Sequence, residues 1–188
     1  KAVRPEFEPM LSLGSKCGLS DLDTLVYLDN LCSRLGLDSI SAGSLIAFSM
    51  DLFERGILTP EDTDGLDLSW GNGAAMEVLI KQMAYGEGLG ATLARGIRTA
   101  AQVIGRGAER YAAHVKGLEM AGYHPDNIMG TALGYTVASR GADFSDVYAT
   151  LEYKCLPDQD PDACGGQERI DLKSIHGKAE LCRRDMII

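Results

Sequence analysis

Apolar residues recur every three or four positions along most of this chain, and glycine often stands where such a run ends. In the first run, residues 21–35, the apolar positions share one helical face and Gly36 follows the last of them. A second run covers residues 41–55 and a third covers residues 73–85. A repeat of this period does not place apolar side chains on one face of a strand. The sequence therefore predicts a series of packed helices.

Polar residues before these runs predict where the helices begin. Ser20 is placed to cap the first helix, and Asp23, three residues later, completes a capping-box arrangement. Ser41 is placed to cap the second helix. Asp38 lies in the short gap between the two helices. Spacing alone allows two interpretations of Asp38, a residue that helps to start the second helix or one with a functional role.

The remaining segments complete the prediction of an all-α fold, an irregular multi-helix bundle. We expect a fourth helix, a short extended segment and three further helices at residues 91–105, 111–120, 128–139, from about Ser145, and 174–186. Glycine and charged residues concentrate at residues 105–111, which predicts a boundary between two helical groups. We therefore divide the chain into residues 1–108 and residues 109–188.

Composition excludes some classes of partner. Asp and Glu number 27 against 18 Lys and Arg, giving a formal net charge of -9, which argues against binding to nucleic acid. No apolar stretch approaches the roughly 18 residues that a membrane-spanning helix needs, and the first ten residues do not form a secretory signal. The sequence predicts a soluble cytoplasmic protein that binds no membrane.

The five cysteines and three histidines show no metal-binding spacing. Cys32 falls on an apolar helix face, which predicts a core residue. Cys155 and Cys164 flank a loop-like stretch in which a disulfide is conceivable, although free thiols are typical of a cytoplasmic protein. We predict no metal ligand among the residues of this chain.

Five segments follow one another in an order that resembles a known family. They are PEFEPMLSLG, LCSRLGLDSISAG, MAYGEGLGATLARG, HVKGLEMAGYHPDNIMGTALGY and ASRGA. In this order and spacing they resemble the helical second and third domains of aldehyde ferredoxin oxidoreductases, which are tungsten or molybdenum pterin enzymes. The resemblance covers nearly the whole chain. It implies the irregular helical fold of those domains, with residues 1–108 as the second domain and 109–188 as a truncated third domain.

The resemblance assigns cofactor contacts to Gly36, Leu37 and Asp38. In the family a D-x-x-G-L-D segment contacts a pterin, and its final aspartate, here Asp38, hydrogen-bonds the ring system. A carboxylate can accept hydrogen bonds from pterin N–H groups, and a glycine lets the backbone approach closely. The first aspartate of the pattern is Ser33 in this chain, so one contact is weakened or replaced.

The resemblance assigns a catalytic role to Glu8. It matches a family glutamate near the metal that transfers a proton during aldehyde oxidation, which requires a partly dry pocket. Phe7 stands where the family often has a tyrosine that lines the substrate pocket. Without the resemblance, a solvated loop carboxylate would be the favoured interpretation of Glu8.

Three departures from the family pattern bear on activity. The family often has Cys-His after its R-G-A, with the histidine as a second acid or base, but Asp143 and Phe144 follow here. A family lysine near the pterin falls on Asp146, and the family's Y-D-P-R is residues 123–126, Tyr-His-Pro-Asp. These changes imply a substrate other than simple aldehydes, or lost activity.

The resemblance also implies parts that this chain lacks. Relatives hold a 4Fe-4S cluster through a C-x-x-C-x-x-x-C group and a further cysteine, and an amino-terminal β domain covers their pterins. Neither pattern occurs here, and the chain begins at Lys1. We therefore expect a fragment of a longer enzyme that by itself is inactive and binds neither the cluster nor the pterin cofactor stably.

The expected function is that of the longer enzyme. It oxidises aldehydes to carboxylic acids with a tungsten or molybdenum bis-pterin and a 4Fe-4S cluster, and it passes electrons to ferredoxin or another electron-transfer protein. The expected partners of the fragment are the missing amino-terminal domain, the electron carrier and a small aldehyde. Two alternatives remain, a related enzyme that reduces aromatic or enoyl thioesters and a non-catalytic helical interaction module.

Overall fold

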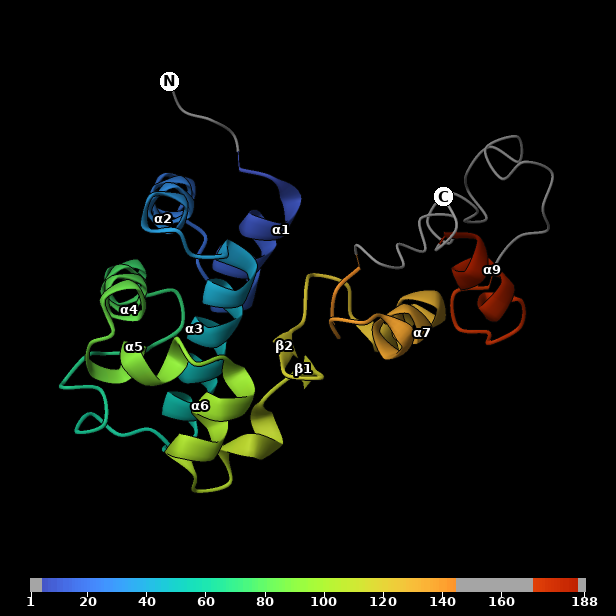
Figure 1. Cartoon of the computed structure of the whole chain (residues 1–188). Helices are drawn as coiled ribbons and strands as arrows, with labels where there is room; N and C mark the ends of the chain where they lie inside the picture. The colour runs from blue at the N-terminus through green and yellow to red at the C-terminus, as the bar shows by residue number, and fades with distance from the viewer. Residues whose placement is uncertain (1–4, 145–170, 186–188) are drawn as a thin grey trace. The chain divides into compact units, whose positions relative to one another are not determined.

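The computed structural model describes residues 5–144 and 171–185, and these ranges are mostly helical (Figure 1). The all-α prediction is confirmed. The elements are α1 Phe7–Pro9, η1 Met10–Gly14, η2 Ser15–Cys17, α2 Leu22–Leu35, α3 Ser39–Glu54, α4 Gly73–Tyr85, α5 Gly88–Leu93, α6 Ile97–Ile104, η3 Ala108–Tyr111, β1 His114–Val115, β2 Leu118–Glu119, η4 Pro125–Asn127, α7 Met129–Val137 and α9 Lys178–Asp185. The helix expected from Ser145 lies outside the described residues.

The helix ends follow the predicted glycine stops, but two predicted caps are wrong. Gly36 ends α2 in the left-handed conformation at φ 73°. The cap of α2 is Asp21, whose side chain accepts a hydrogen bond from the backbone N–H of Thr24, and not Ser20. The cap of α3 is Asp38, and Ser41 supplies the N–H that it accepts. In both cases the aspartate lies three residues before the amide that it satisfies.

Helix α3 is the centre of the first compact unit, residues 1–122. It contacts α1, η1, η2, α2, α4, η3 and β2 (Figure 1). Such a helix needs apolar side chains on more than one face, and its buried residues are Ala42, Gly43, Leu45, Ile46, Phe48, Ser49, Met50 and Leu52. Cys32 of α2 is fully buried in the same core, as predicted.

The single helix expected over residues 91–105 is wrong, because the chain forms two helices there. Gly96 has a φ of 83° and separates α5 from α6. Gly90 is a close-packing position: a Cβ there would lie 2.3 Å from the Cβ of Gln82 and 2.4 Å from the backbone N of Met83. Helix α5 therefore packs directly on the backbone of α4.

The extended segment predicted at residues 111–120 is confirmed as a small antiparallel ribbon. Strand β1 pairs with β2, with His114 opposite Glu119 and Val115 opposite Leu118. The ribbon belongs to the first unit, and β2 contacts both α3 and α6. It brings residues near position 120 against α3, which begins at Ser39, and against α6, which begins at Ile97.

The second compact unit, residues 123–188, is built on α7 and α9. The thiol of Cys182 lies 3.6 Å from the carbonyl oxygen of Gly130, and the backbone N–H of Met129 donates to the carbonyl of Leu172. Tyr135 is 2% exposed and donates from its hydroxyl to the carbonyl of Tyr123. The described part of the unit therefore has packing of its own.

The boundary between the two units falls between residues 122 and 123 of the chain, fourteen positions after the boundary predicted from composition. The extra residues are the ribbon and the turn after it, which pack on the first unit. The assignment of residues 1–108 and 109–188 to two family domains remains a prediction.

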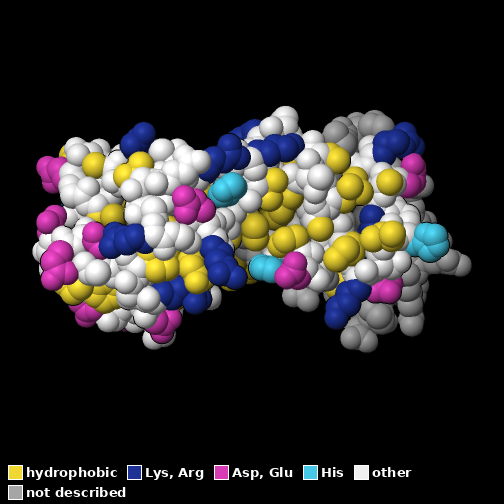
Figure 2. All heavy atoms as spheres, turned by 90° about the horizontal axis from the view of Figure 1, so that it is seen from below, with side chains coloured by type: hydrophobic (Ala, Val, Ile, Leu, Met, Phe, Trp, Pro, Cys, Tyr) yellow, Lys and Arg dark blue, Asp and Glu magenta, His cyan; other side chains and the backbone are white. Residues whose placement is uncertain are grey.

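The surface of the first unit carries acidic and basic side chains in a scattered arrangement on the face shown in Figure 2. Because positive and negative side chains alternate over short distances, that face has no broad region of a single charge. Within the described ranges, no helix combines the length and the apolar character that crossing a membrane requires.

Candidate functional site

Glu8 is a buried carboxylate on the short helix α1, with 9% of its surface exposed. Its Oε2 accepts a hydrogen bond of 2.8 Å from the backbone N–H of Gly122. Its Oε1 is buried and has no hydrogen-bond partner in the described part of the chain. The interpretation of Glu8 as a solvated loop residue is therefore wrong. Phe7, the neighbouring residue, is 54% exposed.

Gly122 must be glycine for this contact to exist in its present form. A Cβ at Gly122 would lie 3.3 Å from both carboxylate oxygens of Glu8 and 2.1 Å from Cδ2 of Leu11. A larger residue would push either Leu11 or Glu8 away. The backbone after β2 and the turn that carries Glu8 are thus fitted to each other, although 114 positions separate them in sequence.

Asp38 has the capping role that the sequence left open. Its side chain is exposed, and Oδ1 accepts a hydrogen bond of 2.7 Å from the backbone N–H of Ser41 in the first turn of α3. Because the cap uses Oδ1, the other carboxylate oxygen of the exposed side chain is still able to accept hydrogen bonds. The predicted contact between Asp38 and a pterin is compatible with this geometry and stays a prediction.

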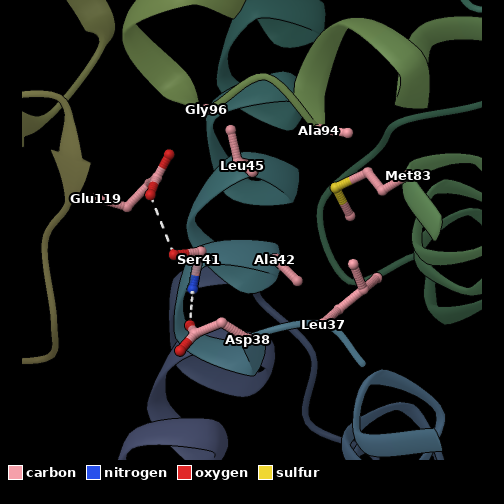
Figure 3. Close-up of a pocket in the computed structure, with 9 residues that line it drawn as sticks. All are labelled: Leu37, Asp38, Ser41, Ala42, Leu45, Met83, Ala94, Gly96 and Glu119. Carbon is pink, nitrogen blue, oxygen red and sulfur yellow. Dashed lines mark hydrogen bonds between the residues drawn. The ribbon is translucent and has the colours of Figure 1, made fainter. Parts of the chain in front are cut away.

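A cavity of about 230 Å³ lies beside Asp38 in the first unit. Its lining residues are Leu37, Asp38, Ser41, Ala42, Leu45, Met83, Ala94, Gly96 and Glu119. Figure 3 shows Asp38, Ser41 and Glu119 joined in a row by hydrogen bonds, with Leu37 and Met83 on the other side of the view. The cavity therefore combines polar acceptors with apolar side chains, which is typical of small-molecule sites.

Glu119 is a charged residue of this cavity that the sequence did not indicate. It is 5% exposed, and its Oε2 accepts from the hydroxyl of Ser41 at 3.0 Å while Oε1 accepts from the backbone N–H of Ile97 at 2.7 Å. The one available signal was an acidic residue within a predicted extended segment, which does not identify its partners. The carboxylate stabilises the beginning of α6 and contacts α3.

Gly36 and Leu37, the other two predicted cofactor contacts, differ in their surroundings. Leu37 lines the cavity, and its backbone N–H donates to the carbonyl of Cys32. Gly36 is exposed, and a Cβ added there would meet nothing within 4 Å among the described residues. In this chain the glycine is therefore required by the left-handed backbone, and a close approach to another group remains a prediction.

The buried thiols are poor candidates for chemistry. Burial raises the pKa of both Cys17 and Cys32 to about 12. The thiol of Cys17 lies 3.3 Å from the carbonyl oxygen of Ser12 and 3.4 Å from that of Gly43. Both cysteines stay protonated near neutral pH, so they do not act as thiolate ligands or nucleophiles.

The departures from the family pattern at residues 123–126, 143 and 144 lie in the second unit. Asp143 is 8% exposed, and its carboxylate forms an ion pair of 2.7 Å with Arg140. The rings of Phe144 and Tyr123 pack edge to face with their centres 5.5 Å apart. Asp146 lies outside the described residues. Both described side chains thus have local packing roles.

The structure brings Glu8, Asp38 and Glu119 into one unit but not into one cavity, since Glu8 does not line the space beside Asp38. Helix α3 connects them, because it carries Asp38 at its start and contacts α1 as well as β2. Among the described residues, no three His, Cys, Asp or Glu side chains are grouped to hold a metal ion.

Comparison with known proteins identifies one family model along almost the whole chain. The model described as "Aldehyde ferredoxin oxidoreductase, domains 2 & 3" matches residues 2–186.

Similar curated proteins are large oxidoreductases. The tungsten-containing aldehyde ferredoxin oxidoreductase of Thermococcus kodakarensis is 35% identical over 138 residues, which cover 73% of this chain and 22% of that protein. The aliphatic sulfonate oxidoreductase WOR-like subunit of Pyrococcus furiosus is 33% identical over 151 residues, covering 77% and 24%. The chain thus spans less than a quarter of the length of these relatives.

A similar solved structure is the active site complex BamBC of benzoyl coenzyme A reductase in complex with 1,5-dienoyl-CoA. It is 29% identical, with a TM-score of 0.65, and the match covers 76% of this chain and 22% of that one.

Proposed function

This chain belongs to the aldehyde ferredoxin oxidoreductase family, and from that premise we propose that it forms part of an enzyme that oxidises aldehydes to carboxylic acids. The proposed cofactor is a tungsten or molybdenum bis-pterin, and the proposed electron acceptor is ferredoxin or a similar carrier. The 4Fe-4S cluster and the domain that covers the pterins would belong to the rest of the enzyme.

The observation that carries this proposal is the environment of Glu8. The carboxylate is buried, one oxygen is held by the N–H of Gly122, and the other has no partner among the described residues. Burying an acceptor without a partner costs about 1–3 kcal/mol. Such a cost is expected where the free oxygen serves a reaction rather than the fold. A fixed carboxylate with one free oxygen is suited to take up and release a proton.

In this proposal one edge of a pterin would bind in the cavity beside Asp38. Asp38 and Glu119 supply carboxylate acceptors that match the amino and ring N–H donors of a pterin. Leu37 supplies apolar surface for the ring. When the rest of the enzyme is in place, Gly36, Leu37 and Asp38 would hold the cofactor, which supplies the two-electron redox chemistry.

The proposed reaction converts an aldehyde and water into a carboxylic acid, two protons and two electrons. Transfer of the electrons to the carrier would be supplied by the rest of the enzyme, which would hold the cluster. In this scheme Oε1 of Glu8 accepts one of the protons, and the Gly122 N–H keeps the carboxylate oriented while it does so.

The longest natural form of the protein tests the proposal. Its metal content and pterin content are measured first, and a protein without either would support a non-catalytic helical module instead. The rate of aldehyde oxidation is then compared for the wild type, Glu8→Gln and Glu6→Gln. We expect Glu8→Gln to lower kcat by about 10²–10⁴-fold, whereas Glu6, an exposed carboxylate on the same turn, gives a neutral control. Wild-type kcat in Glu8→Gln would reject the proposed role.

A second candidate is reduction of aromatic or enoyl thioesters. It is favoured by the similarity to benzoyl coenzyme A reductase in complex with a dienoyl-CoA and by Phe144 at the position where the resemblance implies histidine. Parallel assays of the full-length protein with aldehydes and with acyl-CoA thioesters distinguish the two reactions. Activity on thioesters alone would replace the first proposal.

A further inference from the structure

Lys16 places a positive charge inside the polar region between α3 and the chain that follows β2. Its Nζ donates hydrogen bonds to Oγ of Ser44 at 3.0 Å and to the carbonyl oxygen of Met120 at 2.5 Å. The side chain is half-buried. Ser44 lies on α3, so the ammonium group joins that helix to a residue 104 positions away from Lys16.

The backbone from Glu119 to Gly122 is held on the first unit by three sets of contacts. The side chain of Glu119 bonds to α3 and α6, the carbonyl of Met120 accepts from Lys16, and the N–H of Gly122 donates to Glu8. The carbonyl of Met120 and the N–H of Gly122 are two residues apart. A shift of the Met120 carbonyl therefore moves the Gly122 N–H relative to the Glu8 carboxylate.

Two carboxylates lie near the ammonium group of Lys16 and favour its charged form. Burial lowers the pKa of Lys16, and the nearby carboxylates of Glu8 and Glu119 act in the opposite direction by favouring the ammonium form. Neither carboxylate forms a direct ion pair with it, since no oxygen of Glu8 or Glu119 is within 4.0 Å. The charge of Lys16 therefore acts on Glu8 through space, without a direct contact.

We propose that Lys16 is a positioning residue for Glu8: by binding the Met120 carbonyl it sets the Gly122 N–H against Oε2 of Glu8, which leaves Oε1 directed for proton transfer. The inference rests on the proposed function for its catalytic consequence. Its structural content, the dependence of the Gly122–Glu8 contact on Lys16, is measurable without any cofactor.

The first test follows the Gly122 amide by NMR in the complete protein. An N–H bonded to a carboxylate has a downfield proton resonance, and Glu8→Gln identifies it by shifting it. We expect Lys16→Met to move this resonance upfield and to speed its hydrogen exchange by about five- to tenfold, the effect of one weakened hydrogen bond. Lys16→Arg should keep the wild-type resonance position and exchange rate of the Gly122 amide. Lys81→Met, which removes an exposed lysine, should also leave both unchanged.

A folded Lys16→Met protein with the Gly122 resonance at its wild-type position would overturn the proposal. If Lys16→Met does not fold, Lys16→Thr keeps a polar side chain that is too short to reach the Met120 carbonyl and gives the same comparison.

The second test measures turnover in the holoenzyme. Where Glu8→Gln lowers kcat, Lys16→Met should lower kcat by about tenfold or more with KM within twofold, because misdirection of a catalytic group affects the chemical step. An unchanged kcat in Lys16→Met would then overturn the positioning role. Unchanged kcat in Glu8→Gln itself would reject the proposed role of Glu8, while the Gly122 resonance still decides whether Lys16 places the carboxylate.

Discussion

At the scale of single residues, two carboxylates complete helix N-termini in different ways. Asp38 caps α3 from within its own first turn. Helix α6 begins after Gly96, which has no side chain to do this, and Glu119 from the ribbon accepts from the N–H of Ile97 instead. The exposed N–H groups of a helix need such partners. Glu119 therefore contributes to stability as well as to the cavity beside Asp38.

Replacement of Glu119 tests this role. Glu119→Ala removes the acceptor of the Ile97 N–H and of the Ser41 hydroxyl, so we expect the free energy of unfolding to fall by about 2–4 kcal/mol. Urea denaturation followed by circular dichroism measures the change. Glu109→Ala, at an exposed carboxylate, should stay within about 0.5 kcal/mol of wild type. Equal effects of the two substitutions would contradict the assigned role.

The buried thiol of Cys17 predicts a dependence of stability on alkaline pH. Burial raises its pKa from 9.0 to about 12, so in the folded state the thiol keeps its proton while the unfolded chain loses it. The stabilising contribution is complete below pH 9 and is lost as pH rises toward 12. We expect the free energy of unfolding of the wild type to fall more steeply than that of Cys17→Ala above pH 9. Parallel slopes in urea titrations would contradict this.

At the scale of elements, the fold depends on close contacts between helix backbones. Gly43 of α3 faces the short helix η1, where a Cβ would lie 2.4 Å from the carbonyl oxygen of Ser12. Gly90 of α5 faces α4 at a similar separation. Both glycines have ordinary helical φ values, so spatial approach rather than backbone conformation requires them. Small residues at such positions let helices pack more closely than side chains would allow.

Substitution of Gly90 and of Gly86 distinguishes a glycine required by close approach from one required by its backbone conformation. Gly90→Ala forces α5 away from the α4 backbone and should lower the free energy of unfolding by about 1–3 kcal/mol or more. Gly86→Ala, at a φ of 71° with open space around it, should cost only about 1–2 kcal/mol of backbone strain. Crystal structures or amide shifts should show movement of α5 in the Gly90 variant alone. Movement in neither variant would contradict the close-contact interpretation.

At the scale of the whole molecule, the first unit contains both candidate residues Glu8 and Asp38 together with the core around α3. The ribbon and the turn after it complete that unit, since Glu119, Met120 and Gly122 make its long-range polar contacts. The physical boundary of the unit therefore follows these residues.

Two truncated chains test this boundary. Residues 1–122 should unfold cooperatively, whereas residues 1–108 lack the partners of Glu8, Lys16 and Ser41. We expect the shorter chain to be less stable by about 2–5 kcal/mol, the combined effect of several buried polar groups left without partners. Thermal and urea unfolding measure the difference. Equal stability would favour a boundary near residue 108.

The sequence by itself determined the helices and most of their ends. Apolar periodicity placed α2, α3 and α4 within a few residues, and Gly36 ended α2 as expected. These features are local, because a helix face and a left-handed glycine depend on neighbouring residues only. The break at Gly96 was missed, because a glycine inside an apolar run does not by itself show whether the helix continues, and only the fold gives its φ of 83°.

The tertiary structure decided which polar groups meet. Gly122 lies against the buried Glu8 carboxylate. The partners of Lys16 stand 28 and 104 positions away along the chain, and those of Glu119 stand 22 and 78 positions away. No local pattern reports such contacts, since each depends on how the ribbon packs against α3. The sequence could nominate Glu8 and Asp38 only by resemblance. The fold supplied the physical observation that supports Glu8 as a candidate functional residue. One of its buried carboxylate oxygens has no partner among the described residues.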